Sequence, residues 1–490
     1  MSILCPFRSV QRDPAERQER SRMKRLLPFL LLGLLASSLQ AETLTVTTSP
    51  SQRTRTGNLI VVLSPREFRA DSPGLMNVYA GKILVGEGYT SGDTLNFELP
   101  PGTEGWYAGA YLDENQNFMW RGLPDTTELY SSRVVKLSTP NPSITVDANR
   151  TPRTIKTPAW ARESSFVSSI LLEEGFSREE ATQNLLVVLP PGYWTSLESY
   201  PVLFVSHGFN GDRRTYDKRY RLWRTYMKEK PMIIVSMDSF GRFGHHLFLN
   251  SEANGSRFDV FTREVVPFID QHWRTNGTRI VYGQSSGGWT AISLLRRAPE
   301  LIHGAVATGP DPLELDDWWM DDNQNLYTNR DGSERKVVPA VGLTMKRFVE
   351  VEVRSRSYGQ FAGFLAPFSP YRPDAQGPFP FESPFDLQSG ALRPEIWSLW
   401  KENDMGEWAR SHPDEARNTF SDHLALIVGD QDEFGLYDTT LKFSETLNSL
   451  SIPHQFKVVE GGGHSDYLEE ETFVKECWTV FTDLAYSKDK

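Results

Sequence analysis

The spacing of hydrophobic positions changes partway along the chain. Across residues 42–147, short apolar or alternating runs are separated by turn clusters such as Ser91-Gly92-Asp93, and no segment has helical periodicity. Short, evenly spaced strands of this kind are typical of a small all-β sandwich. The expected strands cover residues 44–48, 59–63, 82–85, 94–99, 106–112 and 133–137.

Residues 185–490 have a different pattern, in which continuous apolar runs alternate with amphipathic stretches. Continuous apolar runs are typical of strands covered on both faces. Their alternation with helices predicts a doubly wound, mostly parallel sheet of the α/β class. The expected strands cover residues 185–189, 202–206, 232–237, 279–282, 304–308, 424–428 and 454–459, and the expected helices 258–273, 289–297, 438–450 and 468–486. The intervening residues 148–184 are predicted to be a linker and entry segment, because the chain near 143–158 is rich in Thr, Pro and Asn.

The N-terminus has the pattern of a secretory signal. Met23-Lys24-Arg25 is a basic stretch, residues 26–36 are apolar, and Leu39-Gln40-Ala41 is a plausible cleavage site. Residues 1–41 are therefore predicted to be a leader and signal peptide, of which 1–22 form an upstream extension. The apolar stretch is too short to span a bilayer comfortably, so no membrane span is expected in the mature chain. The protein is predicted to be secreted or periplasmic.

Composition narrows the classes of partner. Hydrophobic residues make up 39% and charged residues 23% of the chain, as in a soluble globular protein. The net charge of −11 argues against binding to nucleic acid and to anionic lipid surfaces. Of the two cysteines, Cys5 lies in the leader, so Cys477 has no partner for an internal disulfide and is expected to be a small buried side chain.

The strongest motif is Gly283-Gln284-Ser285-Ser286-Gly287, which reads Gly-x-Ser-x-Gly. It lies between the strand expected at 279–282 and the helix expected at 289–297. Such a corner holds a strained serine with its hydroxyl over the sheet edge, and glycines are needed where strand and helix approach each other. The pattern predicts Ser285 as a catalytic nucleophile.

The long interruption at residues 311–421 is predicted to be an insertion beside this serine. It contains Trp318-Trp319 and many Pro and Phe residues between 361 and 385, with a helical piece near 394–400. Long insertions in compact domains are often lids or binding elements. Since this one leaves the strand after the elbow helix, it is predicted to overhang Ser285; a helical appendage packed beside the sheet is the alternative.

A serine nucleophile requires a base and an orienting acid. His464 is the histidine that follows the last expected strand, on a loop with three preceding glycines, and it is predicted to be the base. The acid is expected after the strand at 424–428. Asp432 is favoured because a turn is needed to aim it at His464, and Asp430 and Glu433 are the alternatives.

The oxyanion of the intermediate requires two fixed donors. These are predicted to be the backbone N–H groups of Ser286 and Phe209. Gly208 lets the backbone approach the substrate, and His207 and Trp289 are also predicted to border the substrate. The alternative roles are structural: His207 would stabilise its loop, and Trp289 would pack the elbow helix against the sheet.

No metal and no cofactor are predicted. The segment that begins at Asp113 imitates the start of a calcium loop, but Phe118 replaces the turn glycine and Pro124 stands where the loop requires glutamate. The pair His245-His246 has no carboxylate or cysteine cluster at ligand spacing.

Residues 185–193, 200–209 and 283–288, which read LLVVLPPGY, YPVLFVSHGF and GQSSGG, resemble the putative-esterase family of α/β-hydrolases. Feruloyl esterases, S-formylglutathione hydrolases and enterochelin esterases belong to that group. The resemblance implies ester hydrolysis through an acyl-serine intermediate. Two features depart from the family pattern: Ser286 stands where Met often follows the nucleophile, and the insertion at 311–421 is larger than usual.

Together these patterns predict an exported serine esterase that acts on a small-molecule or carbohydrate-linked ester. A serine peptidase of the same fold is one alternative. A non-catalytic binding protein that uses the β-sandwich is another. The sequence does not specify the acid and alcohol halves of the ester, the role of the β-sandwich or the oligomeric state.

Overall fold

The computed structural model describes residues 43–49, 54–121, 128–138, 141–150, 156–320, 323–339, 342–375 and 377–486. Ala41–Lys490 form one compact unit. The predicted leader and signal peptide, residues 1–41, lie outside the described residues.

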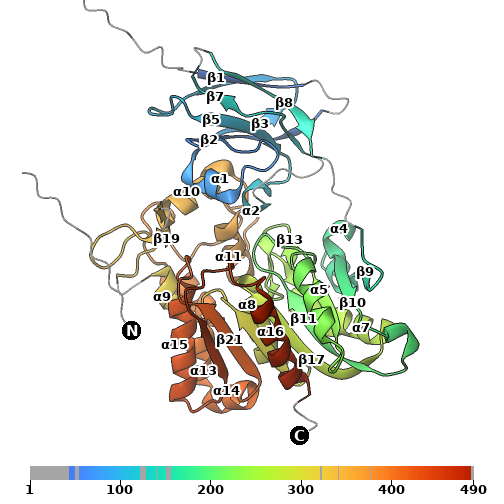
Figure 1. Cartoon of the computed structure of the whole chain (residues 1–490). Helices are drawn as coiled ribbons and strands as arrows, with labels where there is room; N and C mark the ends of the chain where they lie inside the picture. The colour runs from blue at the N-terminus through green and yellow to red at the C-terminus, as the bar shows by residue number, and fades with distance from the viewer. Residues whose placement is uncertain are drawn as a thin grey trace, which may run out of the picture. The chain divides into compact units, whose positions relative to one another are not determined.

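Residues 161–459 contribute an eight-stranded, mostly parallel sheet (Figure 1). Only β10 runs antiparallel to its neighbours β9 and β12. The strand order is β22-β21-β18-β17-β11-β12-β10-β9. In chain order the strands are β9 (Ala161–Val167), β10 (Thr182–Val188), β11 (Tyr200–Ser206), β12 (Ile233–Met237), β17 (Thr275–Gln284), β18 (Gly304–Thr308), β21 (Leu424–Gly429) and β22 (Gln455–Val459).

The seven strands expected in residues 185–490 are all present, but the segment before them was interpreted incorrectly in part. Residues 148–184 are more than a linker, since they contain β9, α3 (Ser169–Glu173) and α4 (Arg178–Ala181), and β10 begins at Thr182. The β9 sequence ARESSFV is polar because it is an edge strand with an exposed face, so it lacks the continuous apolar run of the central strands.

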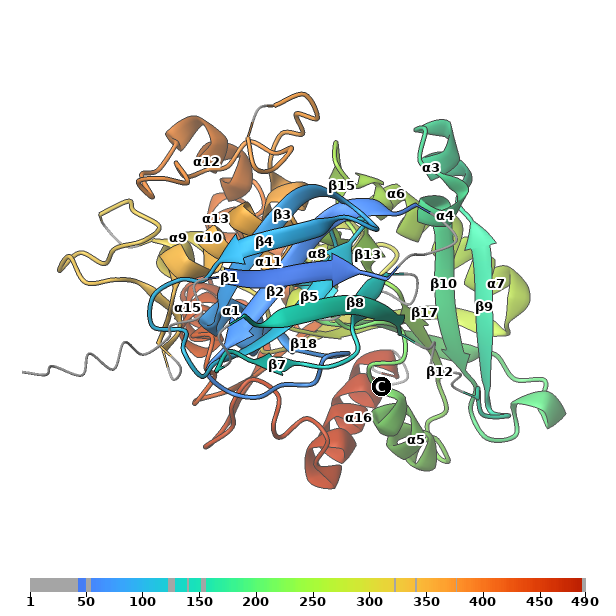
Figure 2. The ribbon, with the colours of Figure 1, turned by 90° about the horizontal axis from the view of Figure 1, so that it is seen from above.

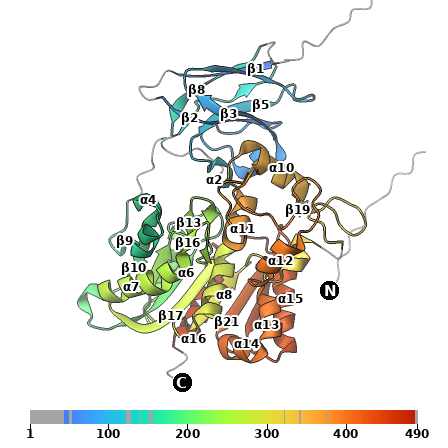
Figure 3. The same ribbon diagram turned by 180° about the vertical axis from the view of Figure 1, so that it is seen from behind.

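Helices cover both faces of this sheet, because its strands direct alternate apolar side chains to opposite sides. In β11, Leu203 and Val205 pack with α5 (Asp217–Tyr226) and α16 (Glu471–Ala485), whereas Val202 and Phe204 belong to the core of the other face. Figure 3 shows that opposite side, where α8 and α15 lie along the sheet. The helical elements on that face of the sheet are α6 (Arg257–Val260), a π-helical turn (Phe261–Val265), α7 (Val266–His272), α8 (Ser286–Arg297) and α15 (Leu436–Ser449). Cys477 in α16 is fully buried, as expected, and burial raises the pKa of its thiol to about 12.

The N-terminal segment also contains eight strands in one sheet, ordered β3-β2-β5-β6-β8-β1-β4, with β7 paired to β5. Figure 2 shows β8, β1 and β4 side by side. Apolar residues from β1, β2, β5 and β8 share one core. The strands are β1 (Thr43–Thr48), β2 (Thr56–Ser64), β3 (Lys82–Thr90), β4 (Thr94–Glu98), β5 (Tyr107–Asp113), β6 (Leu129–Ser131), β7 (Val135–Lys136) and β8 (Ser143–Asn149).

The short strand β6 was not expected from the sequence, and two further features of this segment differ from the prediction. The first is β8, which occupies residues expected to begin the linker and extends to Asn149, beyond the boundary set at 147. The second is the presence of two short helices, α1 (Leu75–Ala80) and α2 (Phe118–Arg121). Each spans too few residues to show a helical period, so pattern alone could not find them. That the segment is an independent β-sandwich domain stays a prediction.

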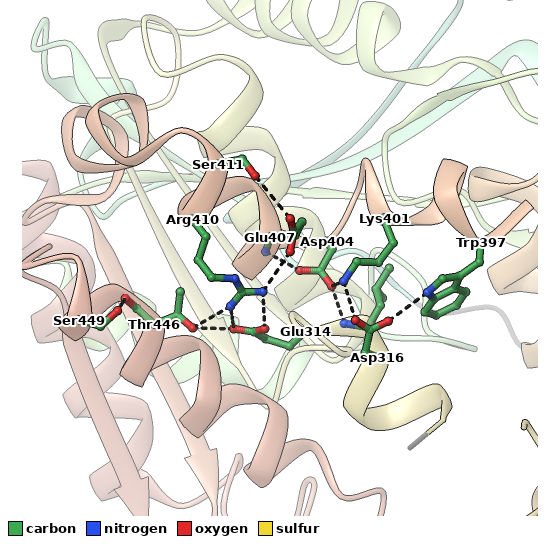
Figure 4. A network of polar contacts seen from close by, with 11 residues as sticks. Glu314, Asp316, Trp397, Lys401, Asp404, Glu407, Arg410, Ser411, Thr446 and Ser449 are labelled. Atoms are coloured by element: carbon green, nitrogen blue, oxygen red, sulfur yellow. Dashed lines mark hydrogen bonds and ion pairs between the residues drawn. The ribbon is translucent and has the colours of Figure 1, made fainter. Parts of the chain in front are cut away.

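The insertion at 311–421 combines helices and two short strands with long irregular stretches. Its elements are α9 (Leu315–Trp319), β19 (Lys336–Val338), β20 (Leu343–Thr344), α10 (Met345–Ser355), α11 (Gln360–Phe368), α12 (Pro394–Lys401), α13 (Met405–Ser411) and α14 (Pro413–Phe420). Ion pairs join its two ends to each other, and hydrogen bonds with Thr446 attach them to α15 (Figure 4). Buried Glu314 accepts hydrogen bonds from Arg410 at 3.0 Å and from Thr446 of α15 at 2.7 Å. Lys401 bridges Asp316 and Asp404.

Candidate active site

Ser285 occupies the sharp corner between β17, which ends at Gln284, and α8, which begins at Ser286. Its backbone has φ 56° and ψ −126°, a conformation that L-residues rarely adopt. A Cβ on Gly283 would come within 2.0 Å of the Gly287 carbonyl oxygen, and one on Gly287 within 2.2 Å of the Ser206 oxygen. The glycines are therefore required by close approach of the backbone, as expected from the motif.

Backbone hydrogen bonds hold the corner in place. The Ser285 N–H donates to the Thr308 carbonyl of β18 at 3.0 Å. The Ser285 carbonyl accepts from the N–H groups of Trp289 at 3.0 Å and Asp311 at 3.1 Å. The strained serine is thus fixed between the elbow helix and the first residues of the insertion.

His464 lies in the same cavity as Ser285 and is paired with Asp432. The His464 Nδ1 atom is 2.8 Å from Asp432 Oδ2. The other carboxylate oxygen of Asp432 accepts the Phe434 N–H at 2.9 Å, and this fixes the acid against the imidazole. The Phe434 ring packs edge-on against the imidazole, with 4.9 Å between ring centroids.

The two alternative acids bond to the backbone of the histidine loop. Asp430 accepts the Gly461 N–H at 2.7 Å, and Glu433 accepts the His464 N–H at 2.8 Å. The structure therefore brings Asp432, rather than Asp430 or Glu433, to the imidazole. The other two carboxylates hold the loop that carries His464.

The electrostatics of His464 suit a base. Burial lowers the pKa of its imidazole, but the hydrogen bond and charge of Asp432, together with the charges of Asp311 and Glu433, outweigh burial, and the pKa is raised above its ordinary value. Asp432 is 1% exposed at its side chain, so its interaction with the ring is little screened by water.

Asp311 is a site residue for which sequence reasoning assigned no role. It is 4% exposed and follows β18 after Gly309-Pro310. One oxygen accepts the Ser285 hydroxyl at 3.1 Å and the other accepts the Ser286 hydroxyl at 2.5 Å. Burial raises the pKa of Asp311, while the two hydroxyl donors oppose that rise. The signal that could have found it is its position, because the carboxyl ends of neighbouring parallel strands meet at one edge of the sheet.

No hydrogen bond between Ser285 Oγ and His464 occurs among the described residues. In this structure the Ser285 hydroxyl donates to Asp311 instead. Catalytic hydrogen bonds are often long or absent without substrate and form in the reactive complex.

The predicted oxyanion loop lies against the elbow. A Cβ on Gly208 would be 3.2 Å from both the Ser285 Cβ and the Gln284 carbonyl oxygen, so only glycine allows this approach without displacement. Gly208 and Phe209 line the cavity together with Ser285. The Ser286 N–H is at the first position of α8, where helical N–H groups have no acceptor within the helix.

The structure corrects two predicted substrate contacts. His207 is fully buried, and its ring accepts the Ser239 N–H at 2.9 Å. Trp289 is 2% exposed and packs against Phe368 of α11, with 5.4 Å between ring centroids. Neither lines the main cavity, because both side chains are directed into packed structure. The structural roles given as alternatives, loop stabilisation for His207 and helix packing for Trp289, therefore fit these contacts better.

The cavity above Ser285 has a volume of about 350 Å³. The insertion supplies Trp318, Val337, Phe348, Gln360 and Phe364 to its lining, as expected if the insertion overhangs the serine. Leu75, from α1 of the N-terminal segment, lines it as well. Its opening as a lid stays a prediction.

Comparison with known proteins identifies the family. The model of the family described as putative esterase matches residues 180–476, which include the elbow, the oxyanion loop, Asp432 and His464. The chain belongs to the putative esterase family. It is a carboxylic ester hydrolase, and its mostly parallel sheet has the strand order of an α/β-hydrolase.

Solved structures similar to this esterase include a ferulic acid esterase, at 17% identity over 66% of this chain and 98% of that one, with a TM-score of 0.41. An S-formylglutathione hydrolase from Agrobacterium tumefaciens has 14% identity over 67% and 98%, with a TM-score of 0.42. Fluorophosphonate-binding serine hydrolase F from Staphylococcus aureus has 17% identity over 66% and 98%, with a TM-score of 0.40. None of the curated proteins searched matches the chain.

Within the part of the chain that the structure describes, no helix combines the length and the apolar character that a membrane span requires. Nor do three or more His, Cys, Asp or Glu side chains gather there in a way that could hold a metal ion.

Proposed function

We propose that this protein is an exported esterase that hydrolyses a small-molecule ester through an acyl intermediate on Ser285. The observation that carries the proposal is that the strained Ser285 and His464 line one cavity. The His464 Nδ1 atom is in turn 2.8 Å from Asp432 Oδ2. A strained serine beside an oriented imidazole is the arrangement that nucleophilic acyl transfer requires.

The proposed reaction begins when the Ser285 hydroxyl turns from Asp311 to the Nε2 atom of His464. His464 takes the proton as Ser285 attacks the ester carbonyl, and Asp432 stabilises the imidazolium through Nδ1. The N–H groups of Ser286 and Phe209 bind the oxyanion. His464 then gives its proton to the leaving alcohol, and a water molecule activated by the same histidine releases the acid.

The cavity supports an apolar or aromatic portion in the substrate. Most of the side chains that the insertion contributes are apolar or aromatic, and Phe434 and Leu436 add to them from the acid loop. Such linings bind ligands by removing apolar surface from water, with few polar groups to set orientation. We also include a carbohydrate-linked ester in the proposed substrate range. Its sugar would lie outside this apolar lining.

The test is replacement of the nucleophile. Ser285→Ala is expected to lower kcat/KM for a short-chain aryl ester by at least about 10⁴-fold, and to abolish covalent labelling by an aryl phosphonate. Ser398→Ala, at an exposed position of α12, is the matched control and should behave as wild type. Hydrolysis that survives Ser285→Ala would exclude the acyl-Ser285 mechanism, and cleavage of a peptide library in place of esters would favour a peptidase.

A further inference from the structure

Asp311 is a buried carboxylate at the nucleophile for which the proposed reaction has no use. It lines the main cavity with Ser285 and His464. On its other side it faces Leu315, Trp319 and Phe364, which are apolar. The ion pairs of the described residues do not include Asp311. Its polar partners are the hydroxyls of Ser285, at 3.1 Å, and Ser286, at 2.5 Å.

For a substrate without a donor group, this carboxylate slows the reaction in two ways. It accepts the Ser285 proton that must pass to His464, so the hydrogen bond has to break before attack. When ionised, it also places negative charge beside the oxyanion that the N–H groups of Ser286 and Phe209 would stabilise. Both effects raise the energy of the transition state relative to the ground state.

A hydrogen-bond donor on the substrate removes both effects. A donor that binds Asp311 replaces the Ser285 hydroxyl and leaves it available to His464, and a cationic donor also neutralises the negative charge. We propose that Asp311 is a specificity-determining residue that selects esters whose acyl half carries a protonated amine or a hydroxyl on the carbon next to the carbonyl. This inference rests on the proposed esterase function and specifies its substrate class.

The distances place such a donor within reach. In the acyl-enzyme, a substituent on the carbon next to the carbonyl is three bonds from Ser285 Oγ, the atom that lies 3.1 Å from Asp311 Oδ1. The second oxygen of Asp311 is bonded to Ser286, whose N–H is a proposed oxyanion donor. Asp311 thus lies on the oxyanion side of Ser285, where the acyl group sits, while the alcohol half must lie at His464 to receive its proton.

The experiment compares three esters of matched shape: the phenyl esters of alanine, lactate and isobutyrate, which differ only in an amine, a hydroxyl or a methyl group. In the wild-type protein at about pH 7, kcat/KM should be higher for the alanine and lactate esters than for the isobutyrate ester, by about tenfold to a hundredfold. D311N keeps the shape but removes the charge, so the preference for alanine should fall by about that factor. D311L should remove the preference for both donors.

Controls separate specificity from a general loss of activity. D316N removes a carboxylate of α9 that does not line the cavity and should leave the ratios between esters unchanged. A thermal unfolding curve and the rate of phosphonate labelling at Ser285 confirm that each variant is folded. If D311L fails to fold, the ratios measured for D311N decide.

The results that overturn the inference are distinct from failure of the esterase function. Equal losses for all three esters in D311N would make Asp311 a structural residue. The monoacetate of ethylene glycol and propyl acetate differ only in a hydroxyl or a methyl group on the alcohol half. A preference between these two esters, with none among the three phenyl esters, would place the recognised donor in the alcohol half and contradict the assignment to the acyl half. If wild-type protein hydrolyses no ester and Ser285 takes no phosphonate label, the proposed function itself fails.

Discussion

At the scale of single residues, one carboxylate contacts Ser285 and another contacts His464, and the two act in opposite ways on the proposed proton transfer between them. Asp432 bonds to the imidazole of His464 and raises the pKa of this histidine. Asp311 bonds to the serine itself and draws its proton away from His464. In the proposed mechanism, activity depends on which acceptor holds the Ser285 hydroxyl, in addition to the presence of Ser285, His464 and Asp432.

The first prediction concerns pH. Because the pKa of His464 is raised and His464 must be neutral to accept the Ser285 proton, kcat/KM should increase with pH through a midpoint above the ordinary histidine value of about 6.5. Asp432→Asn removes the charge that raises this pKa, so the midpoint should move to lower pH. The same variant should lower kcat by about 10⁴-fold, since the imidazole loses its orienting partner. A pH–rate profile with an unmoved midpoint would contradict the role of Asp432.

At the scale of elements, a buried hydrogen-bonded cluster joins the N-terminal segment to the insertion. Glu352 of α10 accepts the Tyr79 hydroxyl of α1 at 2.8 Å. It also accepts the backbone N–H groups of Gly359, Phe361 and Ala362 at the start of α11, at 2.9 to 3.1 Å. Burial raises the pKa of Glu352 to about 7, and the four donors oppose that rise. Helices α1, α10 and α11 supply Leu75, Phe348 and Phe364 to the cavity, so this cluster positions part of its lining.

The second prediction tests this cluster with Tyr79→Phe. Loss of a hydrogen bond to a buried carboxylate should lower the free energy of unfolding by about 1–3 kcal/mol and raise KM more than it changes kcat. Since the pKa of Glu352 in the folded protein lies above its ordinary value, its contribution to stability is present at low pH and is lost as the pH rises through about 7. The Tyr79 hydroxyl stabilises the charged form, so the loss in Tyr79→Phe should be larger at pH above that value than below it.

Tyr111→Phe is the matched control for that variant. Tyr111 is also a buried tyrosine of the N-terminal segment, but its hydroxyl has no hydrogen-bond partner among the described residues. Removal of an unsatisfied buried hydroxyl should leave stability unchanged or increase it. Equal losses from the two variants in denaturant unfolding would show that the Tyr79–Glu352 bond does not stabilise the protein.

At the scale of the whole molecule, residues far apart in sequence build one cavity. Leu75 of the N-terminal segment, the insertion and the loops after β11, β17, β18 and β21 all contribute to it. Ala41–Lys490 form a single compact unit, with Cys477 buried. The described residues contain one cysteine, so their fold is held by apolar cores and buried polar clusters rather than by disulfides among them.

The third prediction concerns export. The full-length chain, expressed in a bacterium with two membranes, should be recovered from the periplasm with Glu42 as its first residue, because Leu39-Gln40-Ala41 precedes the expected cleavage point. N-terminal sequencing and cell fractionation measure this. Charged residues in the apolar stretch, as in Leu32→Arg with Leu34→Arg, should block processing. An unprocessed wild-type chain that stays in the cytoplasm would contradict the signal peptide.

The sequence by itself determined the features that depend on neighbours along the chain. Apolar runs predicted the central strands because burial on both faces requires them, and the Gly-x-Ser-x-Gly corner predicted the elbow because close backbone contacts allow only glycine there. It also predicted that Asp432, at a turn after its strand, would lie nearer the base than Asp430.

Only the tertiary structure decided the features that depend on contacts across the fold. The polar edge strand β9 and the antiparallel direction of β10 follow from sheet pairing rather than from local pattern. His207 and Trp289 had the right positions in the sequence for substrate contact, but packing directs both away from the cavity. In the sequence, Asp311 is one acidic residue among several in an irregular stretch. Folding brings it within hydrogen-bond distance of Ser285, because hydrogen bonding depends on distance in space and not on separation along the chain.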